Sequence, residues 1–226
     1  SWAQYPDNKG DVIKAFPEYP NPRDISNIVH KQVESVVNER RLSDMMWAFG
    51  QLLDHDLSVT EANAVFGELD IPMRDPDDIL YAAGSMHFDR AKFEQSTGTV
   101  PGNPREHVNE LTAFIDASNV YGSDKTRFIA LRKADTPYLK TSADGLLLPL
   151  NTEQLPNGGG NNTALFLAGD IRANGQVGLI AMHTLFVREH NRLAKKIADR
   201  YGSASTDQVF HLARKIIGAE MQIITY

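Results

Sequence analysis

A short stretch that combines helical spacing of apolar residues with four polar groups places the strongest constraint on the fold. Between positions 46 and 57 the apolar side chains recur every three or four residues, which is typical of the buried face of an amphipathic helix. Gln51 and His55 are four residues apart, so they lie on one face of that helix. Asp54 and Asp56 flank the histidine. Since burying such groups costs free energy unless each has a partner, the stretch is either a solvated helix end or a buried polar site.

The rest of the chain favours a mainly α fold with few or no strands. Prolines at four positions within residues 1–25 predict an extended arm over the surface of a body formed by residues 26–226. Ser43 is the expected N-cap of the central helix. Glycine and proline interrupt residues 60–105 too often for long helices. Helical segments are expected at about 25–41, 176–201 and 206–226, and a short helix followed by a turn is expected over 123–139.

Composition excludes several classes of protein. With 226 residues, 42% of them hydrophobic, the chain is long enough for one good core. A net charge of −6 offers no basic surface for nucleic acid, and no apolar run approaches the roughly 18 residues of a membrane span. The absence of cysteine excludes disulfides and thiolate metal sites, but it does not exclude secretion.

A second stretch, LTAFIDASNVYG at 111–122, carries oxygen atoms at every other position. In an extended or looping backbone this spacing directs to one side the Thr112 hydroxyl, the Phe114 carbonyl, the Asp116 carboxylate and the Ser118 hydroxyl. Such hard oxygens are the ligands that Ca²⁺ prefers. A buried strand with small polar residues would show the same pattern.

The predicted long helix near the end of the chain contains two histidines on one face. His183 and His190 are seven residues apart, which is two helical turns. Taken alone, they are either metal ligands of a helical bundle or histidines that pack and form hydrogen bonds. Glu189 and Arg192 are three residues apart and are expected to support the helix as an ion pair.

Several motifs together resemble the animal-type haem peroxidases of the peroxidase–cyclooxygenase superfamily. The similarity runs in order from about residue 21 to 226 and is thin through 60–105. The segments that carry it are GQLLDHD at 50–56, LTAFIDASNVYG at 111–122, FLAGDIR at 166–172, MHT at 182–184, REHNRLA at 188–194 and ARKIIGA at 213–219. This resemblance implies the helical haem-peroxidase fold, with the chain as the distal part of the domain.

The resemblance also implies roles for individual residues around a haem b group. His55 corresponds to the distal histidine, which transfers a proton between the two peroxide oxygens. Arg172 corresponds to the distal arginine, a fixed cation that stabilises developing negative charge. Gln51 would hold a distal water or a halide, and Asp54 matches the carboxylate that forms an ester with a haem methyl group.

A structural calcium ion and the fate of the two buried-face histidines follow from the same resemblance. Calcium would be held by one residue of the central helix and four of the second stretch, namely Asp56, Thr112, Phe114, Asp116 and Ser118. The ion would tie that loop to the helix and fix His55 over the haem. His183 and His190 match positions that are not ligands, so they are expected to pack and to form hydrogen bonds.

Two departures from the family pattern limit these expectations. Gly175 stands where mammalian members have a glutamate that makes a second haem ester, and Gln176 stands where some members have a methionine linked to a haem vinyl group. The proximal histidine of the family lies downstream of the segment that matches residues 213–226. We therefore expect the chain to need the remaining C-terminal part of the domain.

The implied function is reduction of hydrogen peroxide with oxidation of a halide, thiocyanate or a small aromatic donor, in a secreted or extracellular protein. Two alternatives stay open. One is the fatty-acid dioxygenase branch of the same superfamily. The other is a calcium-stabilised interaction module that retains the fold without catalysis, although packing alone gives no reason to keep Gln51, His55 and Arg172 together.

Overall fold

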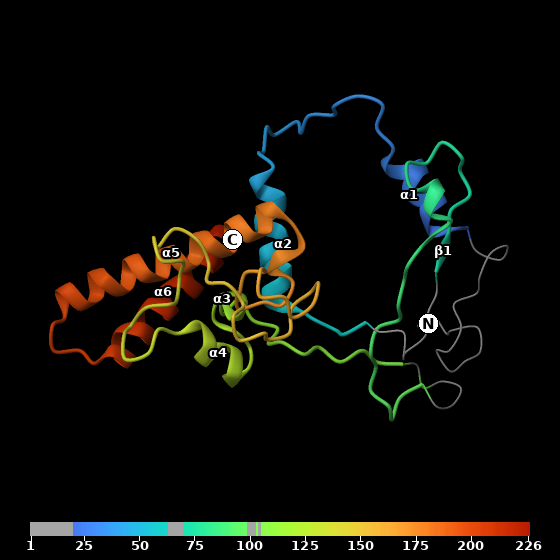
Figure 1. Ribbon diagram of the computed structural model, residues 1–226. Coiled ribbons are helices and arrows are strands. Elements are labelled where there is room, and N and C mark those ends of the chain that lie inside the picture. Colours follow the sequence, from blue (N-terminus) through green and yellow to red (C-terminus); the bar gives the residue numbers. More distant parts are fainter. Residues whose placement is uncertain (1–19, 63–69, 99–102, 104) are drawn as a thin grey trace. The chain divides into compact units, whose positions relative to one another are not determined.

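The computed structural model describes residues 20–62, 70–98, 103 and 105–226. The chain divides into two compact units, one formed by residues 1–38 and 60–110 and the other by residues 39–59 and 111–226. Figure 1 shows the helices and strands of both units. Of the helices in the described part of the chain, none combines the length and the apolarity needed to cross a bilayer.

The first unit contains little regular structure, as the glycines and prolines predict. Helix α1 (Pro22–His30) begins after Asn21, whose side chain accepts hydrogen bonds from the next backbone N–H groups. The predicted arm over 1–25 lies mostly outside the described residues, and its last four residues are helical because this cap and a proline at the first helical position start α1 there. Strands β1 (Ile71–Pro72) and β2 (Ser85–Met86) pair antiparallel, and a short 3-10 helix, η2 (Tyr81–Ala83), precedes β2.

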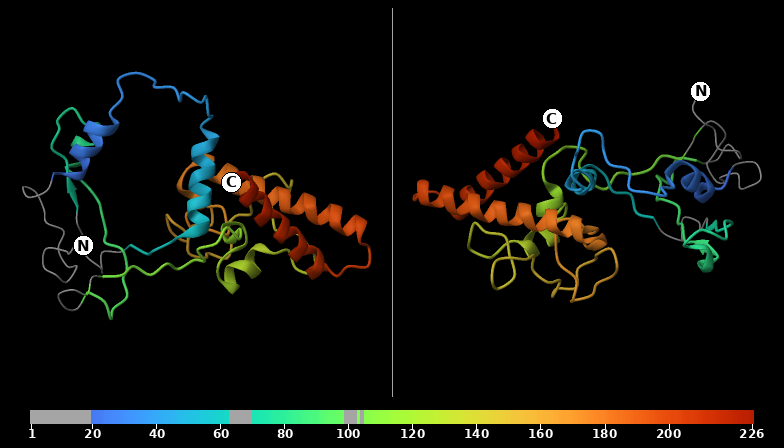
Figure 2. Two further views of the ribbon diagram at one scale, coloured as in Figure 1. Left: turned by 180° about the vertical axis from the view of Figure 1, so that it is seen from behind. Right: turned by 90° about the horizontal axis from the view of Figure 1, so that it is seen from above.

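The second unit is helical and contains the segments that match the family motifs. Its elements are α2 (Met45–Leu57), α3 (Ser118–Tyr121), α4 (Lys125–Leu131), the 3-10 helix η3 (Ala173–Gly175), α5 (Val177–Arg200) and α6 (Thr206–Thr225). Helices α5 and α6 form a hairpin, and α2 packs against α5 (Figure 2). The mainly α prediction is therefore confirmed.

Burial of apolar side chains from several helices explains why these elements pack together. The largest fully buried apolar side chains come from α2, α3, α5, α6 and the loop before η3: Leu52, Tyr121, Leu148, Leu179, Phe210, Ile217 and Met221. Each contributes about 1.5–3 kcal/mol when removed from water. Helix α6 starts with a capping box, in which Ser205 and Gln208 satisfy each other's backbone N–H groups.

Two predicted helix boundaries are wrong. The helix expected over 25–41 ends at His30, and the residues after it are not helical. The residue before the first turn of α2 is Asp44 rather than Ser43, and its side chain makes no capping hydrogen bond. Instead, the Ser43 and Asp44 carbonyls accept the first backbone hydrogen bonds of the helix.

A buried histidine on α5 joins this helix to α3 and to the loop after α4. The carbonyl of Pro137 lies 3.1 Å from Nε2 of His190 and can only accept, so Nε2 carries the proton. Nδ1 therefore accepts from the Tyr121 hydroxyl at 2.8 Å. Burial lowers the pKa of His190 to about 4, so the ring is neutral. His190 packs and forms hydrogen bonds as predicted, and the predicted Glu189–Arg192 ion pair forms.

This histidine predicts a loss of stability in weak acid. Between pH 6.5 and 4 the unfolded chain binds a proton at residue 190 and the folded chain does not, so the free energy of unfolding falls as the pH falls through that window. His190→Gln should reduce the slope by about one proton in denaturant titrations made at a series of pH values. His211→Gln, at an exposed position of α6, is the control and should leave the slope unchanged. An unchanged slope in His190→Gln would contradict the prediction.

Candidate active site

A fully buried carboxylate on α2 organises the start of α3. Oδ2 of Asp56 accepts from the backbone N–H groups of Asp116 and Ala117, both at 3.0 Å. Oδ1 accepts from the Ser118 hydroxyl at 2.9 Å and from the Asn119 N–H at 3.1 Å. Ala117 has a left-handed backbone (φ 62°), which turns successive N–H groups toward one anion. The Asp56 carboxylate thus offsets the cost of this conformation.

The segment that carries Arg172 is held against α3 by a glycine. A Cβ atom at Gly169 would lie 2.4 Å from the Asn119 carbonyl oxygen, so a larger residue would push the segment away. On the other side, the buried guanidinium of Arg127 in α4 donates to the Ala168 carbonyl at 2.9 Å and to the Pro156 carbonyl. These contacts fix the backbone immediately before Asp170.

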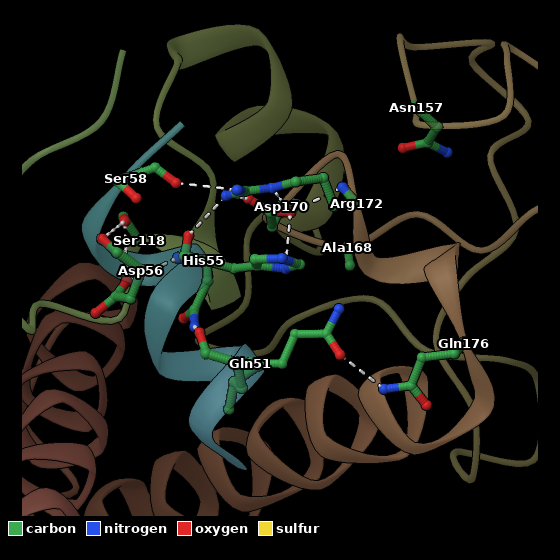
Figure 3. A network of polar contacts seen from close by, with 12 residues as sticks. Gln51, His55, Asp56, Ser58, Ser118, Asn157, Ala168, Asp170, Arg172 and Gln176 are labelled. Atoms are coloured by element: carbon green, nitrogen blue, oxygen red, sulfur yellow. Dashed lines mark hydrogen bonds and ion pairs between the residues drawn. The ribbon is translucent and has the colours of Figure 1, made fainter. Parts of the chain in front are cut away.

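Arg172 is clamped by Asp170 and reaches the end of α2. Its Nε and Nη2 donate to the two carboxylate oxygens of Asp170 at 3.0 and 2.8 Å. Its Nη1 donates to the Ser58 carbonyl at 3.0 Å and its Nη2 to the His55 carbonyl at 3.3 Å (Figure 3). A cation at this position is favoured by the negative end of the helix. Burial alone would raise the pKa of Asp170, but the hydrogen bonds and charge of Arg172 outweigh it and lower that pKa.

His55 lies between α2 and this ion pair. Its side chain is 8% exposed, and its Nδ1 lies 3.5 Å from Asp170 Oδ1, without the geometry of a hydrogen bond. Burial lowers the pKa of His55, and the positive charge of Arg172 lowers it further, against the opposing charges of Asp170 and Asp54. The ring is therefore held neutral at pH 7, with a fixed cation beside it.

Gln51 lies one turn before His55 on the same helix, as predicted. Its Oε1 accepts a hydrogen bond of 3.0 Å from the Gln176 amide, which belongs to the residue before α5. Asp54 is exposed on the surface of α2. The structure thus places Gln51 and His55 one turn apart on α2 and brings Arg172, more than a hundred residues later in the chain, to the carbonyls at the end of that helix.

The oxygens predicted to bind calcium are connected, but they are bonded to each other. The Thr112 hydroxyl donates to Asp116 Oδ2 at 3.0 Å, and the Ser118 N–H donates to Asp116 Oδ1 at 3.0 Å. The Phe114 side chain is 75% exposed. The alternation of side chains ends at residue 116, because α3 begins at Ser118, and the segment is a loop rather than the alternative strand. Among the described residues, no cluster of three or more acidic or imidazole groups is positioned for a metal.

Three residues of the site had no assigned role in the sequence. Asp170 clamps Arg172, Arg127 holds the preceding loop, and Asn119 donates to the Leu52 carbonyl at 2.7 Å. Of the three, only Asp170 could have been recognised in the sequence, because it lies two residues before an arginine outside a predicted helix.

The expectation for His183 was half right. It is 1% exposed and packs in the core, but neither ring nitrogen has a hydrogen-bond partner among the described residues. Burial lowers the pKa of His183 to about 4, against the opposing negative charge of Asp170 and a smaller contribution from the nearby Asn119 main chain.

Comparison with known proteins decides the family. Residues 2–226 match the family model described as animal haem peroxidase. The chain belongs to this family.

The animal haem peroxidase assignment is supported by curated relatives. Peroxidase mlt-7 of Caenorhabditis elegans is 34% identical over 99% of this chain and 32% of its own length. Lactoperoxidase of Mesocricetus auratus is 35% identical over 96% of this chain and 35% of its own length. Thyroid peroxidase of Homo sapiens is 33% identical over 96% of this chain and 28% of its own. The chain therefore spans about a third of the length of these relatives.

Solved structures with a similar fold are consistent with this family assignment. Peroxidase A of Dictyostelium discoideum matches with a TM-score of 0.82 and 26% identity, over 97% of this chain and 45% of that chain. A fatty acid alpha-dioxygenase of Arabidopsis thaliana matches with a TM-score of 0.68 and 19% identity, over 89% and 29%. The second likeness shows the fold alone.

The clamp on Arg172 predicts a large stability effect at Asp170. Asp170→Asn keeps the shape but removes the buried charge that pairs with the guanidinium, so the free energy of unfolding should fall by about 2–4 kcal/mol. Urea denaturation measures it. Combining Asp170→Asn with Arg172→Gln should cost less than the sum of the two single changes.

Asp199→Asn is the matched control, because Asp199 pairs with Lys195 at an exposed position of α5. It should change the free energy of unfolding by less than about 1 kcal/mol. Equal effects at positions 170 and 199 would show that Asp170 does not clamp Arg172.

Proposed function

We propose that this chain forms the peroxide-activating side of a haem peroxidase, which reduces hydrogen peroxide and oxidises a halide, thiocyanate or a small aromatic donor. The observation that carries this proposal is a neutral imidazole, His55, beside a cation, Arg172, that Asp170 holds in place. This is the pairing of proton acceptor and charge stabiliser that cleavage of a peroxide bond requires.

The residues around His55 fit a flat apolar group such as haem b. Nδ1 of His55 is buried and has no hydrogen-bond partner in the part of the chain that the structure describes, and Arg172 reaches the carbonyls at the end of α2. Large apolar side chains next to the site in the chain remain uncovered: Ile171 is 39% exposed and Val177 is 86% exposed. An apolar cofactor would cover such surface. When bound, its iron would hold the peroxide and supply the redox chemistry.

The side chains of the chain itself move the proton and stabilise charge. His55 is neutral, so one ring nitrogen can take a proton from the bound peroxide oxygen and return it to the departing one. Arg172 cannot deprotonate and its guanidinium donates four hydrogen bonds, so it presents a fixed positive charge to the oxygen that gains electrons. Gln51 offers an amide on the same face of α2.

The bonds to the cofactor are proposals that rest on the family resemblance. Asp54 is exposed on α2 and is the carboxylate proposed to form a haem ester. Gly175 has no side chain for a second ester, so the haem would be a weaker oxidant than in doubly linked relatives, and iodide and thiocyanate are favoured over chloride. His183 and His190 are buried inside the second unit. On the family resemblance, in which these positions are not ligands, we assign the axial iron ligand to the remaining part of the domain and the protein to the extracellular space.

Calcium is proposed as a structural ion that binds between α2 and the loop before α3. Asp56, Thr112, Asp116 and Ser118 supply hard oxygens that already contact one another, and the carbonyl of Phe114 would complete the set. Burial, with a smaller contribution from the negative charge of Asp116, raises the pKa of Asp56 against its hydrogen bonds. A cation would remove this cost once the two hydroxyl hydrogens turned away.

Peroxide kinetics test the proposed catalytic roles in the full-length protein. His55→Ala and Arg172→Gln should each slow the first spectral change after mixing with hydrogen peroxide by about 10²-fold or more. Stopped-flow absorbance measures this rate. His211→Ala, on exposed α6 surface, should react like the wild type. A wild-type rate in His55→Ala with full haem content would exclude the proposed role of His55.

Metal removal tests the calcium site. A calcium chelator should lower both the melting temperature and the haem content, because the loop would no longer fix the end of α2. Asp116→Ala should lower both in the same direction and should remove further sensitivity to the chelator. Asp199→Ala, at an exposed position of α5, should remain chelator-sensitive. If the chelator changes neither property in the wild type, the assignment is wrong.

A further inference from the structure

A directed chain of hydrogen bonds runs from the first turn of α5 to Gln51. The Gly178 N–H donates to Gln176 Oε1 at 2.6 Å, and Gln176 Nε2 donates to Gln51 Oε1 at 3.0 Å. A backbone N–H can only donate, so the Gln176 amide must turn its oxygen to Gly178 and its nitrogen to Gln51. Gln51 must then accept through its own oxygen. The orientation of the Gln51 amide is therefore set by the backbone of α5.

The packing of α2 on α5 leaves room for this arrangement only because residue 178 is glycine. A Cβ atom there would lie 2.9 Å from Gln176 Oε1 and 3.6 Å from the Cβ of Ala48. The first contact is too close, so an alanine at this position would displace the amide of Gln176. Gln176 thus has two functions, as the N-cap of α5 and as the partner of Gln51.

The remaining NH₂ group of Gln51 is a pure donor, and it faces the candidate active site. Figure 3 shows the Gln51 nitrogen turned away from Gln176, on the side of the amide where His55 and Arg172 lie. A pure donor favours a ligand that accepts hydrogen bonds, and an acceptor that carries negative charge forms the stronger bond. A reversed amide would present its carbonyl oxygen, which would repel such a ligand.

We propose that Gln176 is a positioning residue that holds the Gln51 amide with its NH₂ toward the active site, and so makes the site select a small anion such as thiocyanate as the electron donor. This inference rests on the proposed function, because it names the donor class of the same site. Gln176 acts on the anion through Gln51 in this scheme and does not bind the peroxide itself.

Two substitutions separate the orientation of Gln51 from the capping of α5. Gln176→Ser keeps an N-cap oxygen but is too short to reach Gln51, so the Gln51 amide becomes free to rotate. Gln176→Glu keeps the cap and presents a second oxygen to Gln51, which reverses the Gln51 amide and adds a charge. The thiocyanate dissociation constant should rise about threefold for Gln176→Ser and about tenfold or more for Gln176→Glu.

Thiocyanate binding is measured on the haem-loaded full-length protein without peroxide, both by absorbance titration and by the thiocyanate-dependent rise in melting temperature. In turnover, Gln176→Ser should raise the KM for thiocyanate more than it lowers kcat. Gln208→Glu is the matched control, because it makes the same change at the start of α6 and keeps the capping box. It should leave thiocyanate binding unchanged.

A double-mutant cycle decides whether Gln176 acts through Gln51. In a Gln51→Ala background, Gln176→Ser should no longer change the thiocyanate dissociation constant. The inference is overturned if the wild type does not bind thiocyanate, if Gln176→Ser binds it as the wild type does, or if the effect persists without Gln51. A wild type that binds thiocyanate as described but does not turn over peroxide would instead reject the proposed function.

Discussion

The geometry of the site depends on one buried carboxylate. The Asp56 carboxylate is fully buried, and its desolvation costs free energy. Four hydrogen bonds from α3 and the loop before it offset that cost. Because these donors are mostly backbone groups, Asp56 fixes the path of the chain at α3. Gly169 then lets the segment before Arg172 lie directly on α3, and Arg172 returns to the carbonyls at the end of α2. These contacts connect α2 to α3, α3 to the Arg172 segment and that segment back to α2. A substitution at any of these contacts is therefore expected to change the position of His55.

Three consecutive residues of α2 lie in three different environments. Asp54 is exposed, His55 faces the ion pair, and Asp56 is buried against α3. Successive side chains on a helix point about 100° apart, which allows this separation within one turn. Asp56 therefore fixes α2 against α3, while His55 points from a neighbouring face of the helix toward the ion pair. Nδ1 of His55 has no hydrogen-bond partner among the described residues. The residue is nevertheless held in position, because its carbonyl accepts a hydrogen bond from Arg172 and the neighbouring Asp56 is bonded to α3.

The sequence predicted the helices that carry strong periodicity and the residues that a family motif marks. Helices α2, α5 and α6 appear within a residue or two of their expected limits, because apolar spacing records which face is buried. The end of α1 and the N-cap of α2 were wrong, since boundaries depend on a few local hydrogen bonds that periodicity does not encode. The hydrogen bonds of Gln176 to Gln51 and of Arg172 to Ser58 join residues more than a hundred positions apart in the chain. Such contacts are properties of the tertiary structure, and a single sequence carries no direct signal of them.

The long separation between the two sides of the site has a consequence for synthesis. The bond from Arg172 to Ser58 spans 114 residues, and that from Asn119 to Asp56 spans 63. Contacts of this kind close large loops and slow folding. At about 5–20 residues per second on the ribosome, α2 emerges roughly 6–23 s before Arg172 can reach it. During that interval its apolar stripe and its unpaired carboxylate have no native partners. The arrangement that makes His55 rigid in the finished protein therefore leaves α2 open to non-native contacts while the chain is being made.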